Sequence, residues 1–539
     1  MELAFQASRS GPTSCQAGAI SLHSSYDPER EAERYLDGAA GGRTPSCFIL
    51  SGPCIDYLSP AIRKRFGEAL VISIQHDARF SDCPGRLPGG GGADAVWYPG
   101  CAMSREAFLD ACLPEDALGG VVFLEWPAAA RAYPAEAELT RKAVKSVLDR
   151  LASSNATLRT YGRLWIRNAC RNVLLAEPLL AVPEGAVTSR PVVVAAAGPS
   201  LGEALEALRP FRDRFLLLAV SSALAACRQA GLDPDLVVAS DGGFWSRLHL
   251  YPLASQGKPI AMPLVAAPPP AIDPPLPRLV LVQGNFPEPE LAPLVGGGLA
   301  LPGHGTVSGT ALHLAARLSS GPVAVAGMDL ASRDILSHAR PHGFDSVTRE
   351  AQSRLEPLEG LVRAREAPLA PLALPEWPWR TSRSLSIYAA ALSQEALLPP
   401  FAGRLWRIAP SPIALAGYSP LEASRGDLEA FFSGLPGEEG GEAGLPLQKQ
   451  EALPLSGRKA ALLDRIEGWK DLAKGAAASF AAGSLPRSGR AAEFLKAVDL
   501  PWWTAACRAV LAGRDAGKAA RELEAGAFAF ADGLMERFL

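Results

Sequence analysis

The chain has 539 residues, which is enough for about three to four domains of the usual ~150 residues. Hydrophobic residues make up 48% and charged residues 20%, and the formal net charge is -3, so the composition predicts a globular protein and argues against a nucleic-acid-binding platform. No apolar run reaches the ~18–20 residues of a membrane span, and the amino terminus has no apolar signal region. Nine cysteines without a C-x-x-C pair predict buried thiols in a reducing compartment. Together these features predict a cytoplasmic enzyme of several domains.

The first 160 residues alternate between short apolar runs and helical segments. The runs at Cys47–Pro53, Ala69–Gln75 and Gly119–Pro127 have the composition of buried strands. A helical period of apolar residues then extends from Glu136 to Leu175. We therefore expect a small N-terminal α/β domain over residues 1–160.

A β-α-β-α-β pattern begins at Pro191, where the strand PVVVAAA ends at a glycine. The strands RFLLLAVS and PDLVVASDGG follow with helices between them, and RLVLVQGN and PVAVAGMDL come later. This order predicts a Rossmann-like doubly wound sheet in a central domain over residues 161–430.

The last part of the chain changes composition twice. Residues 431–457 are rich in Gly, Pro and Glu, which predicts a linker. Residues 458–539 are rich in Ala, Leu and charged residues with a helical period, which predicts an α-helical C-terminal domain. The expected fold class is therefore α/β, with the Rossmann-like central domain between a smaller α/β domain and a helical one.

Gly198, Pro199 and Ser200 form the first candidate site, where a buried strand gives way to a helix. The glycine allows close approach of a ligand to the backbone, and the serine is a suitable helix cap. Free N–H groups at such a helix start suit a phosphate, although an ordinary turn with a capping serine is the competing interpretation. The motif is neither a Walker A loop nor G-x-G-x-x-G, so it lacks the usual support for an ATPase or a NAD enzyme.

Asp241 and Gly242 form a second candidate site at the end of the third strand of this pattern. Ligands of open α/β sheets bind at the carboxyl ends of the strands, so we expect Asp241 to share an edge with Gly198. Ser221, at the end of the second strand, falls on the same edge. The alternative is that Asp241 only caps the segment that follows it.

Gly305, Thr306 and Ser308 belong to a third candidate site, a polar loop that runs into a helix. The hydroxyls and the backbone N–H groups of such a loop resemble a second anion cradle. A capped helix with a glycine hinge is the alternative interpretation.

Asp329 and His338 form a fourth candidate, since Asp329 ends a strand and His338 follows it. Histidine is the natural proton carrier near neutral pH, so both residues are candidate catalytic groups together with Asp241. Pro341 lies between His338 and His342 and disfavours a helical metal-binding pair. We therefore predict no metal ligands.

Six sequence motifs occur in the order found in a known family: SSYDPEREAERYL, TLRTYGRLWIRNACRNV, AAAGPSL, GLDPDLVVASDGG, GTVSGTALHLAARL and AVAGMDLASRDILSHA. The chain thereby resembles the motility accessory factors (Maf), bacterial flagellin glycosyltransferases of the domain-of-unknown-function 115 type, over roughly residues 24–420. The resemblance implies transfer of a nonulosonic acid of the pseudaminic or legionaminic type from a CMP-activated donor to Ser or Thr of flagellin in the cytoplasm. It implies CMP-nonulosonic acid and flagellin as partners, no separate cofactor and no requirement for a divalent metal.

The central block is also similar to bacterial CMP-sialic-acid sialyltransferases. Their G-N-G-P-S turn corresponds to residues 196–200, with Ala197 in place of the Asn, and Ser221 replaces a second Asn. Their T-S-G loop corresponds to residues 307–309, and their G-I-D-F strand end to residues 327–330. Their histidine before the last helix has no counterpart at residues 379–382, so the general base is not assigned by resemblance.

Two other functions agree with the same motifs. The domain family also includes archaeal pterin diphosphokinases, which use ATP and Mg²⁺. A non-catalytic flagellin-binding scaffold is the second alternative, and it is favoured by the departures at Ala197 and Ser221. The sugar, the acceptor sites and the oligomeric state are left open by the sequence.

Overall fold

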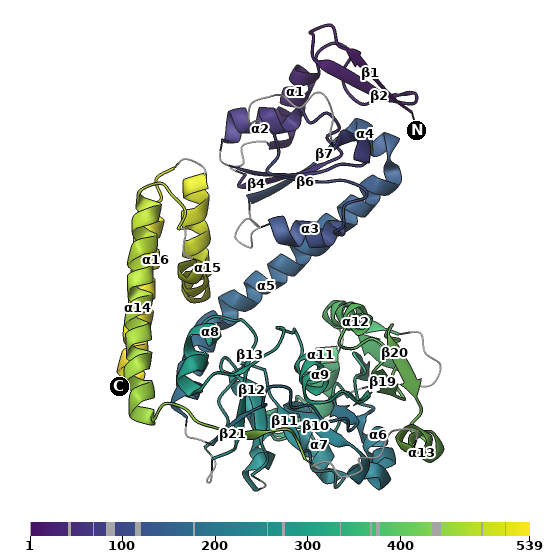
Figure 1. The fold of residues 1–539 in the computed structure, drawn as a ribbon, viewed down its shortest axis with the longest axis vertical. Helices are drawn as coiled ribbons and strands as arrows, with labels where there is room; N and C mark the ends of the chain where they lie inside the picture. Colours follow the sequence, from purple (N-terminus) through teal and green to yellow (C-terminus); the bar gives the residue numbers. More distant parts are fainter. Residues whose placement is uncertain are drawn as a thin grey trace. The chain divides into compact units, whose positions relative to one another are not determined.

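The structure is a computed structural model of the chain. It describes residues 2–40, 45–67, 69–81, 92–113, 120–175, 178–255, 257–271, 275–334, 336–366, 369–372, 378–433, 444–486, 489–511 and 514–538. The chain forms two compact units: a terminal unit of Met1–Gly162 with Glu467–Gly533, and a central unit of Arg163–Ile466 with Leu534–Leu539. Figure 1 shows the helices and strands of both units. None of the helices in the described ranges is long and apolar enough to cross a membrane.

The terminal unit contains the parallel sheet predicted for the first 160 residues. Its strands have the order β6-β5-β4-β7, and all neighbours are parallel. Their bounds are β4 Cys47–Ser51, β5 Leu70–Ile74, β6 Ala95–Trp97 and β7 Val121–Glu125. The helices around them are α1 Pro28–Ala40, α2 Leu58–Phe66, α3 Arg105–Cys112 and α4 Pro127–Ala132. All five residues of β4 are buried, which explains its unbroken apolar sequence.

A small antiparallel sheet precedes this parallel sheet and was not predicted. It consists of β1 Leu3–Ala7, β2 Thr13–Ala17 and β3 Ile20–Ser21. Its sequence gave no clear signal because β1 is almost entirely exposed and therefore lacks an apolar alternation.

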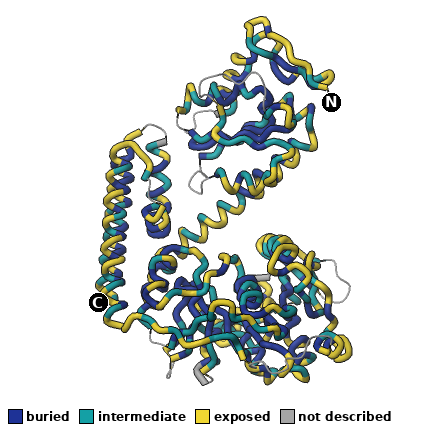
Figure 2. Tube along the Cα trace, in the orientation of Figure 1, coloured by how far each residue is buried: buried dark blue, intermediate teal, exposed yellow. Residues whose placement is uncertain are grey.

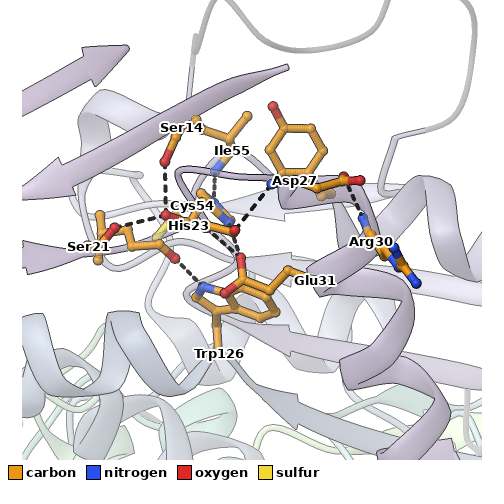
Figure 3. A network of polar contacts seen from close by, with 12 residues as sticks. Ser14, Ser21, His23, Asp27, Arg30, Glu31, Cys54, Ile55 and Trp126 are labelled. Atoms are coloured by element: carbon orange, nitrogen blue, oxygen red, sulfur yellow. Dashed lines mark hydrogen bonds and ion pairs between the residues drawn. The ribbon is translucent and has the colours of Figure 1, made fainter. Parts of the chain in front are cut away.

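His23 joins this antiparallel sheet to the parallel one (Figure 3). Its ring Nε2 accepts a hydrogen bond from the N–H of Ile55 at 3.2 Å, and its carbonyl accepts one from Ser14 Oγ at 2.8 Å. Burial lowers the pKa of His23 to about 4, so the ring is neutral at pH 7. Glu31 accepts the N–H of Ser24 at 2.8 Å, so the motif SSYDPEREAERYL serves here to start and anchor α1.

The helical segments of the chain are long. Helix α5 extends over Pro134–Leu174, and the C-terminal helices are α14 Leu455–Ala481, α15 Gly489–Leu511 and α16 Gly517–Phe538. Trp469 of α14 stacks on Phe494 of α15 with 5.6 Å between ring centroids, and both side chains are fully buried. A Cβ at Gly162 would collide with the backbone of Ala497, so this glycine lets α5 and α15 pack closely. The predicted helical C-terminal region is thereby confirmed.

The central unit is built on the doubly wound sheet that the sequence predicted. Its strands have the order β20-β19-β15-β9-β10-β11-β12-β13-β8-β21, and β14 pairs with β13. Every pairing is parallel except that of β21 with β8. The bounds are β8 Leu179–Ala181, β9 Val192–Ala195, β10 Leu216–Val220, β11 Leu236–Val238, β12 Ile260–Pro263, β13 Arg278–Val282, β14 Leu299–Ala300, β15 Val323–Ala326, β19 Leu405–Ile408, β20 Tyr418–Leu421 and β21 Gln448–Gln450.

Strand β21 lies within the segment predicted as a linker, residues 431–457. Residues 434–443 of that segment lie outside the described residues. The three-part division of the chain therefore stays a prediction beside the two compact units of the structure.

Helices cover both faces of the central sheet, and the strands between them are buried (Figure 2). The helices are α6 Leu201–Leu208, α7 Leu224–Gln229, α8 Glu288–Leu291, α9 Val307–Leu318, α10 Asp345–Ala351, α11 Leu358–Glu366, α12 Arg383–Ala396 and α13 Arg425–Ser433. A second small sheet is formed by β16 Ser332–Arg333, β17 Ala370–Pro371 and β18 Trp379–Thr381. Helix α9 contacts β9, β10, β11 and β15, so this helix packs on the middle of the sheet.

The strand order reverses between β9 and β15. The chain first moves outward through β10, β11, β12 and β13, and then returns to place β15 on the other side of β9. In open α/β sheets the crevice outside the carboxyl ends at such a switch point is where ligands bind.

Candidate functional site

The predicted turn at Gly198 lies at this switch point, at the carboxyl end of β9. The N–H of Gly198 donates to the carbonyl of Gly327 at 2.7 Å, which joins the ends of β9 and β15. A Cβ on Gly198 would lie 2.6 Å from Asp329 Oδ2. Gly327 has φ +68° and would likewise collide with the turn if it carried a side chain. Two glycines therefore allow two strand ends to touch.

Asp329 fastens this turn from the end of β15. Its Oδ2 accepts the N–H of Ser200 at 2.8 Å, and its Oδ1 accepts the hydroxyls of Ser200 at 2.6 Å and Ser411 at 2.9 Å. The side chain is 1% exposed. Burial raises the pKa of Asp329, although the bonds from Ser200 and Ser411 oppose that rise. Ser200 therefore directs both of its donors to Asp329 and makes no side-chain cap to α6, so the prediction of a capping serine with a free N–H at this turn is wrong.

Arg407 of β19 lies next to Asp329 on the interior side of this turn. It is buried, donates to the carbonyls of Met328 and Ile413, and lies near enough to Asp329 for their charges to interact. Burial lowers the pKa of Arg407 to about 10, which leaves it charged at pH 7. A buried cation beside Asp329 offsets part of the cost of burying that carboxylate.

Asp241 lies at the end of β11 and is exposed. Its Oδ1 accepts the N–H of Gly243 at 2.7 Å, which closes a tight turn. Gly242 is buried, and a Cβ there would lie 2.5 Å from the ring of Trp165 in α5. Asn168 donates from Nδ2 to the carbonyl of Gly242 at 3.0 Å. The carboxylate of Asp241 is therefore presented to solvent on a firmly held backbone.

The other predicted binding residues lie at neighbouring positions of the edge. Ser221 follows β10 and is 4% exposed. Thr306 caps α9, since its Oγ1 accepts the N–H of Gly309 at 3.0 Å, while Gly305 is exposed and Ser308 is half-buried in the first turn. The structure therefore shows the capped helix of the alternative interpretation, and an anion at this positive helix end stays a prediction.

His338 lies on the segment after β15 and is exposed. The N–H of the next residue, Ala339, donates to the carbonyl of Ala197 at 2.9 Å, which holds this segment over the end of β9. The ring of His338 stacks on His342 at 4.5 Å between centroids, and His342 contacts His249 at 4.6 Å. Burial lowers the pKa of His342 to about 3 and that of His249 to about 4, so both are neutral at pH 7.

Sequence reasoning missed several residues that build the site. Asn168 and Asn172 are spaced by four residues on α5, and their side-chain amides bind carbonyls at the ends of β11 and β12. The i, i+4 pair of amides in this helical stretch was the available signal. Ser411 and Arg407 gave no signal, because they approach Asp329 only through the order of the strands.

The described ranges contain no group of three or more His, Cys, Asp or Glu side chains arranged to hold a metal ion. The predicted site residues are instead polar groups and backbone N–H donors along one edge: Gly198, Pro199, Ser200, Ser221, Asp241, Gly242, Gly305, Thr306, Ser308, Asp329 and His338. Such an edge can hold an anionic ligand through helix starts and can offer a base, at Asp241 or His338, to a second substrate.

A family match covers the part of the chain that forms this edge. Residues 165–334 match the sequence model of a family described as 6-hydroxymethylpterin diphosphokinase MptE-like. The matched segment runs from Trp165 in α5 to the segment after β15, and so includes Gly198, Asp241 and Asp329.

Solved and curated relatives extend the comparison. The Maf glycosyltransferase from Magnetospirillum magneticum AMB-1 has the same fold, with a TM-score of 0.62, 11% sequence identity, and coverage of 100% of this chain and 92% of that one. Two uncharacterized proteins of Treponema pallidum (strain Nichols) are similar in sequence, one 31% identical over 258 residues and one 30% identical over 115 residues. These matches cover 48% and 21% of this chain, and the chain spans about half the length of each, 56% and 53%.

Proposed function

We propose that the protein is a glycosyltransferase of the Maf type that transfers a nonulosonic acid from a CMP-activated donor to Ser or Thr of flagellin in the cytoplasm. The observation that carries the proposal is the MptE-like domain with its polar carboxyl edge at the β9/β15 switch point, in a chain that shares the Maf fold along its whole length. The pseudaminic or legionaminic type of sugar and the flagellin acceptor rest on the sequence resemblance.

In this reaction the acceptor hydroxyl oxygen attacks C2 of the donor sugar as the bond from C2 to the phosphate oxygen breaks. CMP leaves with the electron pair of that bond, and the hydroxyl proton passes to a base on the enzyme. The helix starts at α6 and α9 would stabilise the charge that develops on the phosphate. We assign the proton to Asp241 or His338, because both are exposed at the edge whereas both carboxylate oxygens of Asp329 are already bonded.

The test is transfer in solution. Purified full-length protein, CMP-nonulosonate and unmodified flagellin are mixed, and the intact mass of flagellin should rise by whole sugar residues. Asp241→Ala and Asp241→Asn should abolish the increase without unfolding the protein, and the asparagine keeps the acceptor atom that closes the turn to Gly243. Asp213→Ala, an exposed aspartate before β10, is the matched control and should transfer normally. Full modification of flagellin by the Asp241 variants contradicts the assignment.

A second candidate is a pterin diphosphokinase, which the match to the MptE-like family favours. Calorimetry separates the two, because a CMP-sugar enzyme should bind CMP or CTP, whereas the kinase should bind ATP with Mg²⁺. Tight binding of ATP-Mg²⁺ alone supports the kinase. Unchanged flagellin mass in a strain that lacks the protein, combined with flagellin binding by the purified chain, supports the non-catalytic scaffold.

A further inference from the structure

Three large aromatic side chains are exposed beside the candidate site. They lie on η5, Phe244–Ser255, the segment that directly follows Asp241 and its two glycines. Phe244 and Trp245 are each 58% exposed and Tyr251 is 55% exposed. Within the described part of the central unit, no other aromatic side chain is exposed to this degree. Clustered exposed rings of this kind mark interaction sites more often than single exposed apolar residues do.

The segment that carries these rings is firmly held. Ser246 donates from Oγ to the carbonyl of Gly243 at 2.6 Å, and Arg228 donates to the carbonyl of Pro252 at 2.6 Å. Leu250 and Leu253 are buried in a core with strands β11 and β12. The rings are therefore exposed on an ordered backbone, so little conformational entropy is lost when a partner binds them.

The rings of Phe244, Trp245 and Tyr251 follow Asp241 closely in the chain and lie within reach of the carboxyl edge of the central sheet. Neighbouring strands are about 4.8 Å apart, so the end of β11 is about 10 Å from the end of β9, where the phosphate cradle at Gly198 lies. From Asp241, the three-residue step to Phe244 reaches at most about 11 Å further. With a donor phosphate at β9 and a hydroxyl near Asp241, the rings of η5 would thus lie within reach of the rest of the acceptor.

We propose that Phe244, Trp245 and Tyr251 form a platform that binds the acceptor polypeptide by packing on apolar side chains next to the acceptor hydroxyl. This inference rests on the proposed function and adds the surface that selects the acceptor. At about 2.0 Å per residue, the seven steps from Phe244 to Tyr251 span about 14 Å, the length of about four residues of an extended peptide.

The composition of the platform also suits a protein partner. Tryptophan, tyrosine and arginine dominate the energetics of protein interfaces, and Arg247 lies 5.2 Å from the centroid of the Phe244 ring. The rings of Phe244 and Trp245 contact each other edge to face at 5.4 Å. A cation and three rings on one rigid segment offer both apolar contact and a hydrogen-bond donor to a peptide.

The experiment compares flagellin binding with donor chemistry in the full-length protein. Phe244→Ser and Trp245→Ser are made singly and together, with Leu397→Ser as the control. Leu397 is 60% exposed and follows α12. Binding of unmodified flagellin is measured by interferometry, and release of CMP from CMP-nonulosonate in water is measured without flagellin. We expect flagellin affinity to fall at least about tenfold in the Trp245 variant, with CMP release and the control unchanged.

Each other outcome has a defined meaning. Flagellin affinity that is unchanged in the double variant overturns the platform, even when sugar transfer proceeds. An altered KM for the donor in CMP release also overturns it, because the rings would then hold the donor sugar. Loss of self-association as the sole effect assigns the rings to a contact between copies of the chain and overturns it as well. Flagellin binding that depends on Trp245 without any CMP release or transfer by the wild-type chain refutes the proposed activity and leaves the platform standing.

Discussion

Gly198→Ala tests whether the two strand ends at the switch point must touch. A Cβ on Gly198 would lie 2.6 Å from Asp329 Oδ2, whereas a carbon and an oxygen normally approach to about 3.3 Å. The shortfall is about 0.7 Å, and the oxygen cannot move freely because it accepts the N–H of Ser200 at 2.8 Å. Gly327, which accepts the N–H of Gly198, is also in the way. Overpacking of this kind costs about 1–3 kcal/mol.

Hydrogen exchange followed by mass spectrometry is the suitable assay, because the chain has two units and global unfolding need not be a single transition. Peptides that cover β9 and β15 should exchange about 5- to 160-fold faster in Gly198→Ala, which corresponds to about 1–3 kcal/mol. The control is Gly202→Ala on the exposed side of α6, where an added Cβ has no neighbour within 4 Å. That variant should match the wild type or exchange more slowly. Wild-type exchange in Gly198→Ala would refute the close-approach argument.

Three other variants probe groups that the structure buries. Asn172→Ala should lower local stability by about 1–3 kcal/mol, because the carbonyls of Leu264 and Ala266 lose their donor; exchange in residues 264–267 measures this. Burial raises the pKa of Glu288 to about 7, so its stabilising protonated form is complete below about pH 4.5 and is lost as the pH rises through 7. The wild type should therefore lose about 3 kcal/mol of stability across that range relative to Glu288→Gln, as urea titrations at pH 5 and 8 would show; parallel pH dependence contradicts this. Burial lowers the pKa of His249 to about 4, so it favours unfolding as the pH falls from 6.5 to 4, and His249→Phe should lessen that acid sensitivity.

The fold was predictable where strands are buried on both faces. The runs around β9, β10, β11 and β15 are continuous apolar stretches ended by glycine or a polar residue, and each became a parallel strand. The exposed strand β1 and the short strand β21 had no such signal. The pairing order of the strands could not be predicted from the sequence either. After β14 the chain returns to place β15 beside β9, and this return depends on tertiary packing.

The candidate site was predictable at the level of which residues end strands. Ser200, Asp241 and Asp329 were placed on one edge by the rule that parallel strands end together, and the structure puts them there. Their individual roles were not predictable. Asp241 and Asp329 were both predicted as catalytic groups. In the structure Asp241 is exposed, whereas Asp329 is buried and accepts hydrogen bonds from Ser200 and Ser411. That distinction depends on a serine 82 residues away from Asp329 in the chain.

The edge also explains how a chain with a net charge of -3 could hold an anionic sugar nucleotide. No strong positive field is needed if the phosphate meets backbone N–H groups and helix starts at α6 and α9. Asp329 bonds to the N–H and the hydroxyl of Ser200 and so fixes the start of α6 against the end of β15, which leaves the later N–H groups of the helix start for a phosphate. A carboxylate so close to the cradle would repel a phosphate if it were free, but its oxygens are turned into the protein and Arg407 lies behind it. In the proposed reaction the anion cradle and the proton acceptor would therefore be separate parts of the edge, with the exposed groups Asp241 and His338 as the candidates for proton transfer.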